Sequence, residues 1–169
     1  MGFKTAPGER LHGFARYVAA EHAIEFVHDE ARAAVAGLGR DSLASALEFG
    51  TLTLTARTAD GRIGFPEGYH PKDSWAEAPV SAPSTASGLL YWEPAGDLIR
   101  GGALGIAQVM GVATTFDPHT GWLALHVDAG DVAADDRPET VEFCDGVIAG
   151  LLGPRLVALW IRLREMPGE

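Results

Sequence analysis

The chain has few basic side chains and almost no lysine. Of its 169 residues, 13 are Lys or Arg and 23 are Asp or Glu, which gives a formal net charge of −10. The two lysines are Lys4 and Lys72. Proteins bind nucleic acid and anionic membrane surfaces through clustered Lys and Arg, so we expect neither partner. An acidic balance is typical of a well-dissolved protein, or of one that covers a basic partner.

Cysteine and long apolar runs are also scarce. Cys144 is the single cysteine, which excludes an internal disulfide and a thiolate-rich metal site. The chain has no run of 18 apolar residues, which argues against a membrane-spanning helix. Its first seven residues lack the apolar segment of a signal peptide. Together these absences predict a cytoplasmic protein without membrane contact.

The motifs that mark common cofactor and metal sites are missing. The sequence contains no P-loop, no H-E-x-x-H, no EF-hand loop, no G-x-S-x-G and no C-x-x-C. The glycine-rich stretch 101–105 lacks the G-x-G-x-x-G spacing of a dinucleotide site. No two histidines have the spacing of metal ligands on one element. We therefore expect no cofactor and no metal.

The composition that is present is that of a folded domain. Hydrophobic residues make up 47% of the chain and charged residues 21%, and the length suits one domain. Residues 1–10 contain Pro7 and Gly8 and show no periodicity, which predicts a flexible N-terminal arm. We expect residues 11–169 to form a single α+β domain.

Two segments have the apolar spacing of a helix. Within 13–38, apolar side chains recur every three or four residues, at Ile24, Val27, Ala31, Ala34, Val35 and Leu38. A strand over residues 11–19 is the alternative, because Phe14, Arg16 and Val18 alternate with Ala15 and Tyr17. A second helix is expected over 137–151 with Pro138 in its first turn. Its apolar face would consist of Val141, Cys144, Val147, Ile148 and Leu151.

Alternating and apolar segments elsewhere predict strands. Threonines and leucines alternate over 49–55, and Asp60-Gly61 is typical of a hairpin turn that leads to a return strand at 62–65. Further strands are expected over 89–92, 97–107, 109–116, 122–128 and 156–163, with a turn at 117–121. The last strand is apolar on both faces, which places it in the middle of a sheet. The predicted fold is α+β, a mostly antiparallel sheet covered by two helices, with a half-barrel as the curled alternative.

Three residues are candidates for catalysis. Alternation places His126 on one strand face with Trp122 and Ala124, where an imidazole serves as acid or base near neutral pH. Extrapolated alternation places Glu48 on the apolar face of the neighbouring strand, a setting suited to acid–base work. A helical turn over 42–47 would instead leave Glu48 in water. Arg100, flanked by apolar residues and glycines, would hold developing negative charge in a pocket.

The loop over 66–87 holds most of the candidate binding residues. Long loops in compact domains are often functional, and this one combines polar and aromatic side chains. As a lid, it would place Trp75 over an apolar ligand and Tyr69 or His70 against a polar group. The predicted substrate-binding set is Tyr69, His70, Asp73, Trp75 and Trp122. The alternative is a stiff surface loop whose aromatic side chains only anchor it.

These features predict a small cofactor-independent enzyme or binding protein that acts on an apolar small molecule. The pocket would lie between the sheet and the helix at 13–38, beneath the loop at 66–87. The chemistry would be acid–base catalysis of the isomerase, cyclase or hydratase type. The alternative function is a non-catalytic acidic interaction protein, an adaptor or an inhibitor of a basic protein. A homo-oligomer is compatible with both.

Overall fold

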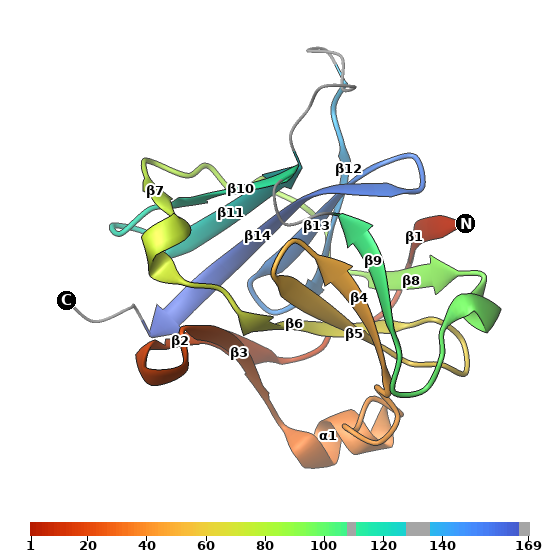
Figure 1. The fold of residues 1–169 in the computed structure, drawn as a ribbon. Coiled ribbons are helices and arrows are strands. Elements are labelled where there is room, and N and C mark those ends of the chain that lie inside the picture. The colour runs from red at the N-terminus through yellow and green to blue at the C-terminus, as the bar shows by residue number, and fades with distance from the viewer. Residues whose placement is uncertain (108–110, 128–135, 166–169) are drawn as a thin grey trace.

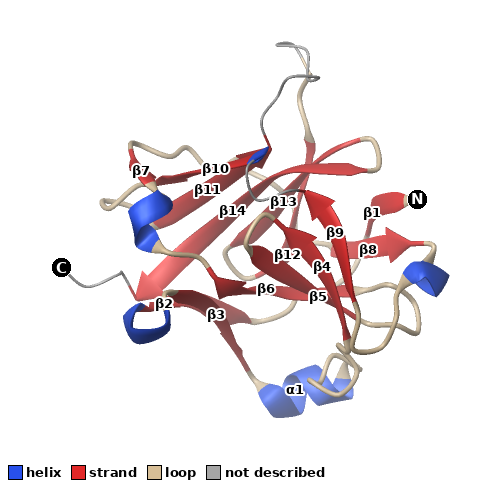
Figure 2. Cartoon of the chain, in the orientation of Figure 1, coloured by secondary structure: helices blue, strands red, loops and turns tan. Residues whose placement is uncertain are grey.

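The computed structural model describes residues 1–107, 111–127 and 136–165, and these are mainly β-strand (Figures 1 and 2). In chain order the strands are β1 (Gly2–Ala6), β2 (Gly13–Val18), β3 (Ala23–His28), β4 (Ser45–Phe49), β5 (Leu52–Ala56), β6 (Ile63–Tyr69), β7 (Ala76–Glu77), β8 (Leu89–Glu93), β9 (Ala103–Ala107), β10 (Val112–Phe116), β11 (Trp122–Val127), β12 (Glu139–Cys144), β13 (Val147–Leu152) and β14 (Arg155–Glu165). The only α-helix in the described residues is α1 (Glu30–Val35), besides short 3-10 turns at Ala19–Glu21, Lys72–Ser74 and Ala95–Asp97. The predicted α+β class, with two covering helices, is therefore wrong.

The strands form one large mixed sheet and one separate pair. The order along the large sheet is β7-β10-β11-β14-β2-β3-β6-β5-β4-β9, and the β12–β13 hairpin joins it through β13 and β14. The pairs β7–β10, β14–β2 and β4–β9 are parallel, and the other pairs are antiparallel. Figure 1 shows α1 at one end of the molecule, directly after β3.

The helix predicted over 13–38 is replaced by the β2–β3 hairpin and the short helix α1. Ala15 pairs with Phe26 and Tyr17 with Ile24, and all four side chains are buried. The hairpin turns through His22, whose φ of 50° lies in the left-handed region. The strand alternative is thus confirmed for residues 13–18. The spacing that suggested one helix combined side chains of β3 with side chains of α1.

The second predicted helix, over 137–151, is the β12–β13 hairpin. Asp145 and Gly146 separate the two strands, and Gly146 has a φ of 68°. Asp-Gly suits the positive φ angles of a tight hairpin turn. Cys144 is buried as expected, but at the end of a strand, where its thiol donates a hydrogen bond to the Gly64 carbonyl at 2.8 Å.

Several predicted strands and turns are confirmed. The β5–β6 hairpin turns through Asp60 and Gly61, and the turn after Asp117 joins β10 to β11. Pro66 does not end β6 as expected, because it pairs with Leu54 next to a shift in strand register, where a missing backbone donor is tolerated. Residues 109–110 and 128 of the predicted strands lie outside the described residues.

Five of the ten residues expected to form a flexible arm lie in strand β1. β1 pairs with β8 from Gly2 opposite Glu93 to Ala6 opposite Leu89. Phe3 is buried and packs edge-on against Trp92, with ring centroids 5.1 Å apart. The division of the chain into an arm and a single domain over 11–169 stays a prediction.

The sheet has apolar side chains on both faces of its central strands. The inner cluster contains the largest fully buried side chains, among them Phe49, Phe65, Leu159 and Ile161. The outer cluster, defined by Ala124, Ile148, Ala158 and Trp160, lies on the other face of β11, β13 and β14. Burial on both sides confirms the central position predicted for the last strand.

The chain segment 78–85 covers the outer cluster. Val80 and Ala82 pack against it. Backbone hydrogen bonds hold the segment at its start, from Ala78 to the Phe116 carbonyl at 3.1 Å, and Thr85 Oγ1 donates to the Thr140 carbonyl at 2.7 Å near its end. The second half of the predicted loop therefore covers an apolar surface of the protein itself.

His70 is a buried polar side chain at the end of β6. Its Nδ1 is 2.6 Å from Thr51 Oγ1, and its Nε2 is 3.1 Å from Thr114 Oγ1. A neutral imidazole has one donor and one acceptor nitrogen, and a hydroxyl can complement either. Only 4% of His70 is exposed, and this burial lowers its pKa to about 4.

We predict that His70 makes the fold sensitive to acid. Between pH 6.5 and about 4 the unfolded chain binds a proton on this imidazole that the folded chain does not bind. The free energy of unfolding should therefore fall as the pH is lowered through this range, by about 3 kcal/mol at about 1.4 kcal/mol per pKa unit. Urea denaturation of the wild type and of His70→Gln at several pH values measures the effect.

The comparison with His70→Gln removes the contribution of carboxyl groups, which titrate in both proteins. The wild type should lose more stability than the variant between pH 7 and pH 4. Parallel pH profiles for the two proteins would show that the imidazole is not held neutral in the fold.

A second prediction concerns the β12–β13 turn. A Cβ at Gly146 would lie 3.2 Å from Cβ of Arg162, whereas Gly153, with a φ of 55°, has open space around it. Gly146→Ala should cost about 1–2 kcal/mol for the left-handed backbone and more for the contact with Arg162. Gly153→Ala should show the backbone cost alone. Equal losses in thermal denaturation would contradict the proposed contact.

Candidate functional site

The three residues predicted for catalysis lie on the surface in separate parts of the fold. Glu48 is exposed on β4 opposite Thr53, because the turn at Gly50 interrupts the alternation that was extrapolated from β5. It therefore faces away from the apolar side chains of β5. Arg100 is exposed and donates to the Asp41 carbonyl at 3.3 Å. Within the described residues, no hydrogen bond or ion pair joins any two of the three.

His126 lies beside the outer cluster, on the face that alternation predicted. Its ring meets Trp160 edge-on, with centroids 5.5 Å apart. One side of the imidazole is open to solvent, while packing against the protein desolvates the other side and lowers its pKa. His126 therefore favours the neutral form, but it lines neither of the two cavities described below.

The predicted binding residues of the 66–87 loop line neither the helix pocket nor the arginine groove, the two cavities of the next paragraphs. Tyr69 is 58% exposed, and Asp73 is exposed in the turn at Lys72–Ser74. Trp75 packs inward between Tyr17 and Phe116, with ring centroids at 5.1 and 5.4 Å, and it also contacts His70. Trp75 thus anchors the loop, as in the alternative that the sequence left open, whereas Tyr69 lies on the surface.

One cavity, the helix pocket, lies between α1 and the chain around residues 9–12. It has a volume of about 310 Å³. Its apolar walls come from Leu11, Ala33, Leu38 and Leu89. Charged side chains also line it: Glu9, Arg10, Asp29, Arg32 and Arg62. The volume is at the lower end of the range for small-molecule sites, about 300–1,000 Å³.

Arg62 is the cation without a carboxylate partner in this pocket. Its guanidinium donates to the backbone carbonyl of Glu9 at 3.3 Å, and no ion pair involves it in the described part of the chain. Burial lowers its pKa from the ordinary value, although an arginine stays protonated. The neighbouring Arg32 is already paired with the Glu9 carboxylate at 3.0 Å.

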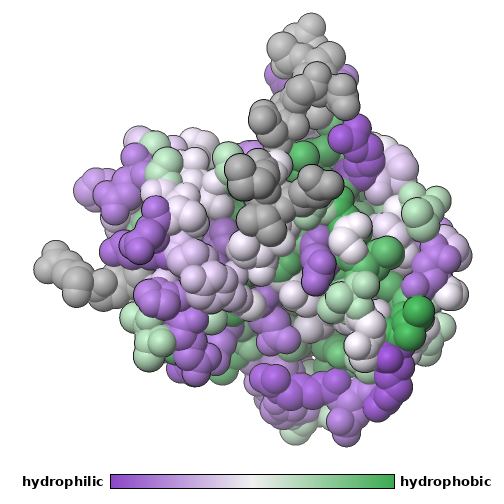
Figure 3. All heavy atoms as spheres, in the orientation of Figure 1, coloured by the Kyte–Doolittle hydropathy of each residue, from purple (hydrophilic) through white to green (hydrophobic). Residues whose placement is uncertain are grey.

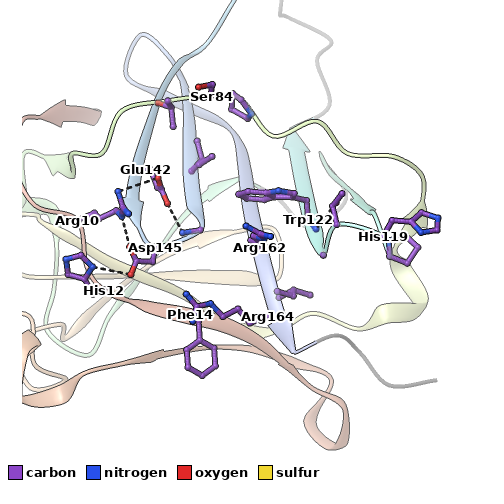
Figure 4. A pocket seen from close by; sticks show the side chains of 18 residues that line it. Arg10, His12, Phe14, Ser84, His119, Trp122, Glu142, Asp145, Arg162 and Arg164 are labelled. Atoms are coloured by element: carbon purple, nitrogen blue, oxygen red, sulfur yellow. Dashed lines mark hydrogen bonds and ion pairs between the residues drawn. The ribbon is translucent and has the colours of Figure 1, made fainter.

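A larger cavity, the arginine groove, has a volume of about 1,030 Å³ (Figure 4). Five segments that are distant in sequence form it: residues 10–14, 83–85, 118–122, 142–148 and 162–164. Of the predicted site residues, only Trp122 lines it. Arg10 and His12 line both cavities, which therefore lie on either side of this short segment.

The carboxylates at one end of the groove already have partners. Asp145 accepts hydrogen bonds from Arg10 Nε at 2.6 Å and from the Gly13 amide at 3.1 Å, and it lies 3.2 Å from His12 Nδ1. Burial raises the pKa of Asp145, but these hydrogen bonds outweigh it and hold the pKa below the ordinary value. Glu142 accepts from the Gly146 amide at 2.8 Å and lies 3.6 Å from Arg10.

The other part of the groove carries two exposed arginines of β14. Arg162 and Arg164 are two residues apart and so extend from the same face of the strand. Trp122 of β11 lies directly opposite Arg162, and the Arg164 guanidinium lies 5.5 Å from the Phe14 ring centroid. The alternation of Ile161, Arg162, Leu163 and Arg164 was the sequence signal for this pair. The predicted strand, which ended at Leu163, left it unused.

Neither a metal-binding cluster nor a membrane-spanning helix occurs in the described part of the chain. In residues 1–107, 111–127 and 136–165, no group of three or more His, Cys, Asp or Glu side chains is placed to hold a metal ion. Within the same ranges, no helix has the length and apolar character needed to cross a membrane.

No model of a known protein family matches the chain, and no curated protein matches it in sequence. The chemistry of the two cavities is therefore the ground on which a function is proposed.

Proposed function

We propose that the protein binds an apolar small molecule that carries an acidic group, and that the ligand occupies the helix pocket. The apolar ligand class follows the sequence prediction. The pocket lies beside the short helix α1, within the segment 13–38 for which a longer helix was predicted, but no residue of the 66–87 loop lines it. The observation that carries the proposal is Arg62, a half-buried cation without a carboxylate partner beside apolar walls.

The half-buried charge of Arg62 has an energetic cost. A buried cation is unfavourable unless an anion or several acceptors compensate it. Arg62 has one backbone acceptor at 3.3 Å, so most of its five N–H donors remain available. A ligand carboxylate fits the planar guanidinium with two parallel hydrogen bonds.

The walls of the pocket supply the other part of the binding energy. Leu11 and Leu38 are 7% and 1% exposed, and Leu89 is half-buried. Each ligand methylene that leaves water for such a surface contributes about 0.8 kcal/mol. An alkyl or aryl carboxylate therefore satisfies both the cation and the apolar walls.

The geometry supports binding rather than catalysis. Glu48, Arg100 and His126 do not line the helix pocket. Acid–base chemistry of the isomerase, cyclase or hydratase type stays a prediction from the sequence. The acidic interaction protein also stays a prediction, and several acidic side chains that it would use are paired with arginines, among them Glu25 with Arg16 at 2.8 Å and Glu30 with Arg40 at 3.2 Å.

Octanoate is the probe that tests this proposal. Isothermal titration calorimetry should detect octanoate binding to the wild type and weaker binding of the neutral 1-octanol. Arg62→Met keeps a long apolar side chain and removes the charge. It should weaken octanoate binding by about 10- to 100-fold, the value of a hydrogen bond to a charged group.

Arg155→Met is the matched control, because Arg155 is an exposed arginine at the start of β14 that lines neither cavity. It should bind octanoate like the wild type. The proposal fails if the wild type does not bind octanoate, if octanol binds as tightly, or if Arg62→Met retains wild-type affinity.

A further inference from the structure

We infer that the arginine groove is a second ligand site, which binds a phosphomonoester attached to a planar ring. The phosphate would lie between Arg162 and Arg164, and the ring against Trp122. Figure 4 shows Arg162 beside Trp122 in the middle of the groove, with Arg164 next to Phe14. The site is separate from the helix pocket and does not rest on the function proposed for it.

Arg162 and Arg164 are two neighbouring cations on one side of β14. Both line the groove, while Leu163 between them is buried, although the register of β14 against β2 shifts between Leu163 and Glu165. Both arginines are exposed, and neither forms an ion pair with a carboxylate in the described residues. Two neighbouring guanidinium groups repel each other, and an anion placed between them removes that repulsion.

The groove itself offers no free carboxylate that could pair with Arg162 and Arg164. Glu142 and Asp145 are the carboxylates of its lining, and both are held by Arg10 or by backbone amides at the opposite end. This leaves two uncompensated positive charges in a chain whose formal charge is −10. An anion is therefore the ligand that these side chains recognise.

The number of negative charges and acceptor oxygens decides which anion can pair with both arginines. A carboxylate carries one charge and suits a single guanidinium. A phosphomonoester carries a charge of about −1.5 to −2 at pH 7 and has three strong acceptor oxygens. It can accept hydrogen bonds from Arg162 and Arg164 together, which a carboxylate on one of them cannot do.

Trp122 forms an aromatic wall of the groove beside Arg162. Trp122 and Arg162 are cross-strand partners in the β11–β14 pair, so their side chains are neighbours on one face. Trp122 is half-buried, which holds its ring while leaving surface for a ligand. Ile148 and Pro118 extend the apolar surface around it. A planar ring attached to the phosphate would stack on this indole.

The probes for the test are phenyl phosphate, inorganic phosphate, phenol and benzoate. Calorimetric titration at low ionic strength and about pH 7.5, where the second phosphate proton is lost, compares the four. Phenyl phosphate should bind the wild type at least about tenfold more tightly than each of the others, because it alone combines a dianion with a ring. Its affinity should fall as salt is added.

Variants separate the two halves of the site. Arg162→Gln combined with Arg164→Gln should weaken phenyl phosphate by about tenfold or more and leave phenol unchanged. Trp122→Leu should reduce phenyl phosphate toward the affinity of inorganic phosphate, which itself should not change. Arg155→Gln, at the other end of the same strand, is the control and should behave like the wild type.

Because both arginines are exposed, the double variant should unfold at the same urea concentration as the wild type. Phenyl phosphate binding to each single variant, Arg162→Gln or Arg164→Gln, gives a second measurement of the same site. The inference is overturned if the double variant binds phenyl phosphate normally, or if benzoate or inorganic phosphate binds the wild type as tightly. Loss of octanoate binding in Arg62→Met has no bearing on these results, so the two sites can fail independently.

Discussion

Strand β14 is the element on which the rest of the fold depends. It pairs with β13 along one edge and with β11 along the other, and its last residues pair with β2. Leu159 and Ile161 belong to the inner cluster, while Ala158 and Trp160 belong to the outer one. The part of a strand that has neighbours on both edges and side chains packed on both faces is removed from water on every side, and residues 156–161 of β14 are accordingly all apolar and buried.

The end of β14 shows how the same strand produces a site. β13 begins directly after the turn of Asp145 and Gly146, with Val147 opposite Ile161 of β14. Beyond Ile161, β2 takes its place beside β14. The Asp145 carboxylate holds Arg10 and the Gly13 amide at this junction. Arg162 and Arg164 face solvent, and the strand that forms the core also forms a wall of the arginine groove.

The acidic composition makes unpaired arginines informative. Arg10, Arg16, Arg32, Arg40 and Arg57 each form an ion pair with a carboxylate in the described structure. Six other arginines have no such pair in the described residues: Arg62, Arg100, Arg137, Arg155, Arg162 and Arg164. Of these six, only Arg62, Arg162 and Arg164 also line one of the two cavities, where a bound anion could pair with them.

The sequence by itself determined the elements whose signals are local. The β5–β6 hairpin follows from alternation and an Asp-Gly turn, and the central position of β14 follows from its apolar run. Asp145-Gly146 carries the same Asp-Gly signal in the middle of the segment 137–151, where the helical spacing of apolar residues wrongly predicted a helix. Only the tertiary structure decided the faces and the cavities. Glu48 faces outward because one glycine turn interrupts the alternation. Arg10 lines one cavity with Arg62 and the other with Arg162, because strand pairing joins segments that no local pattern connects.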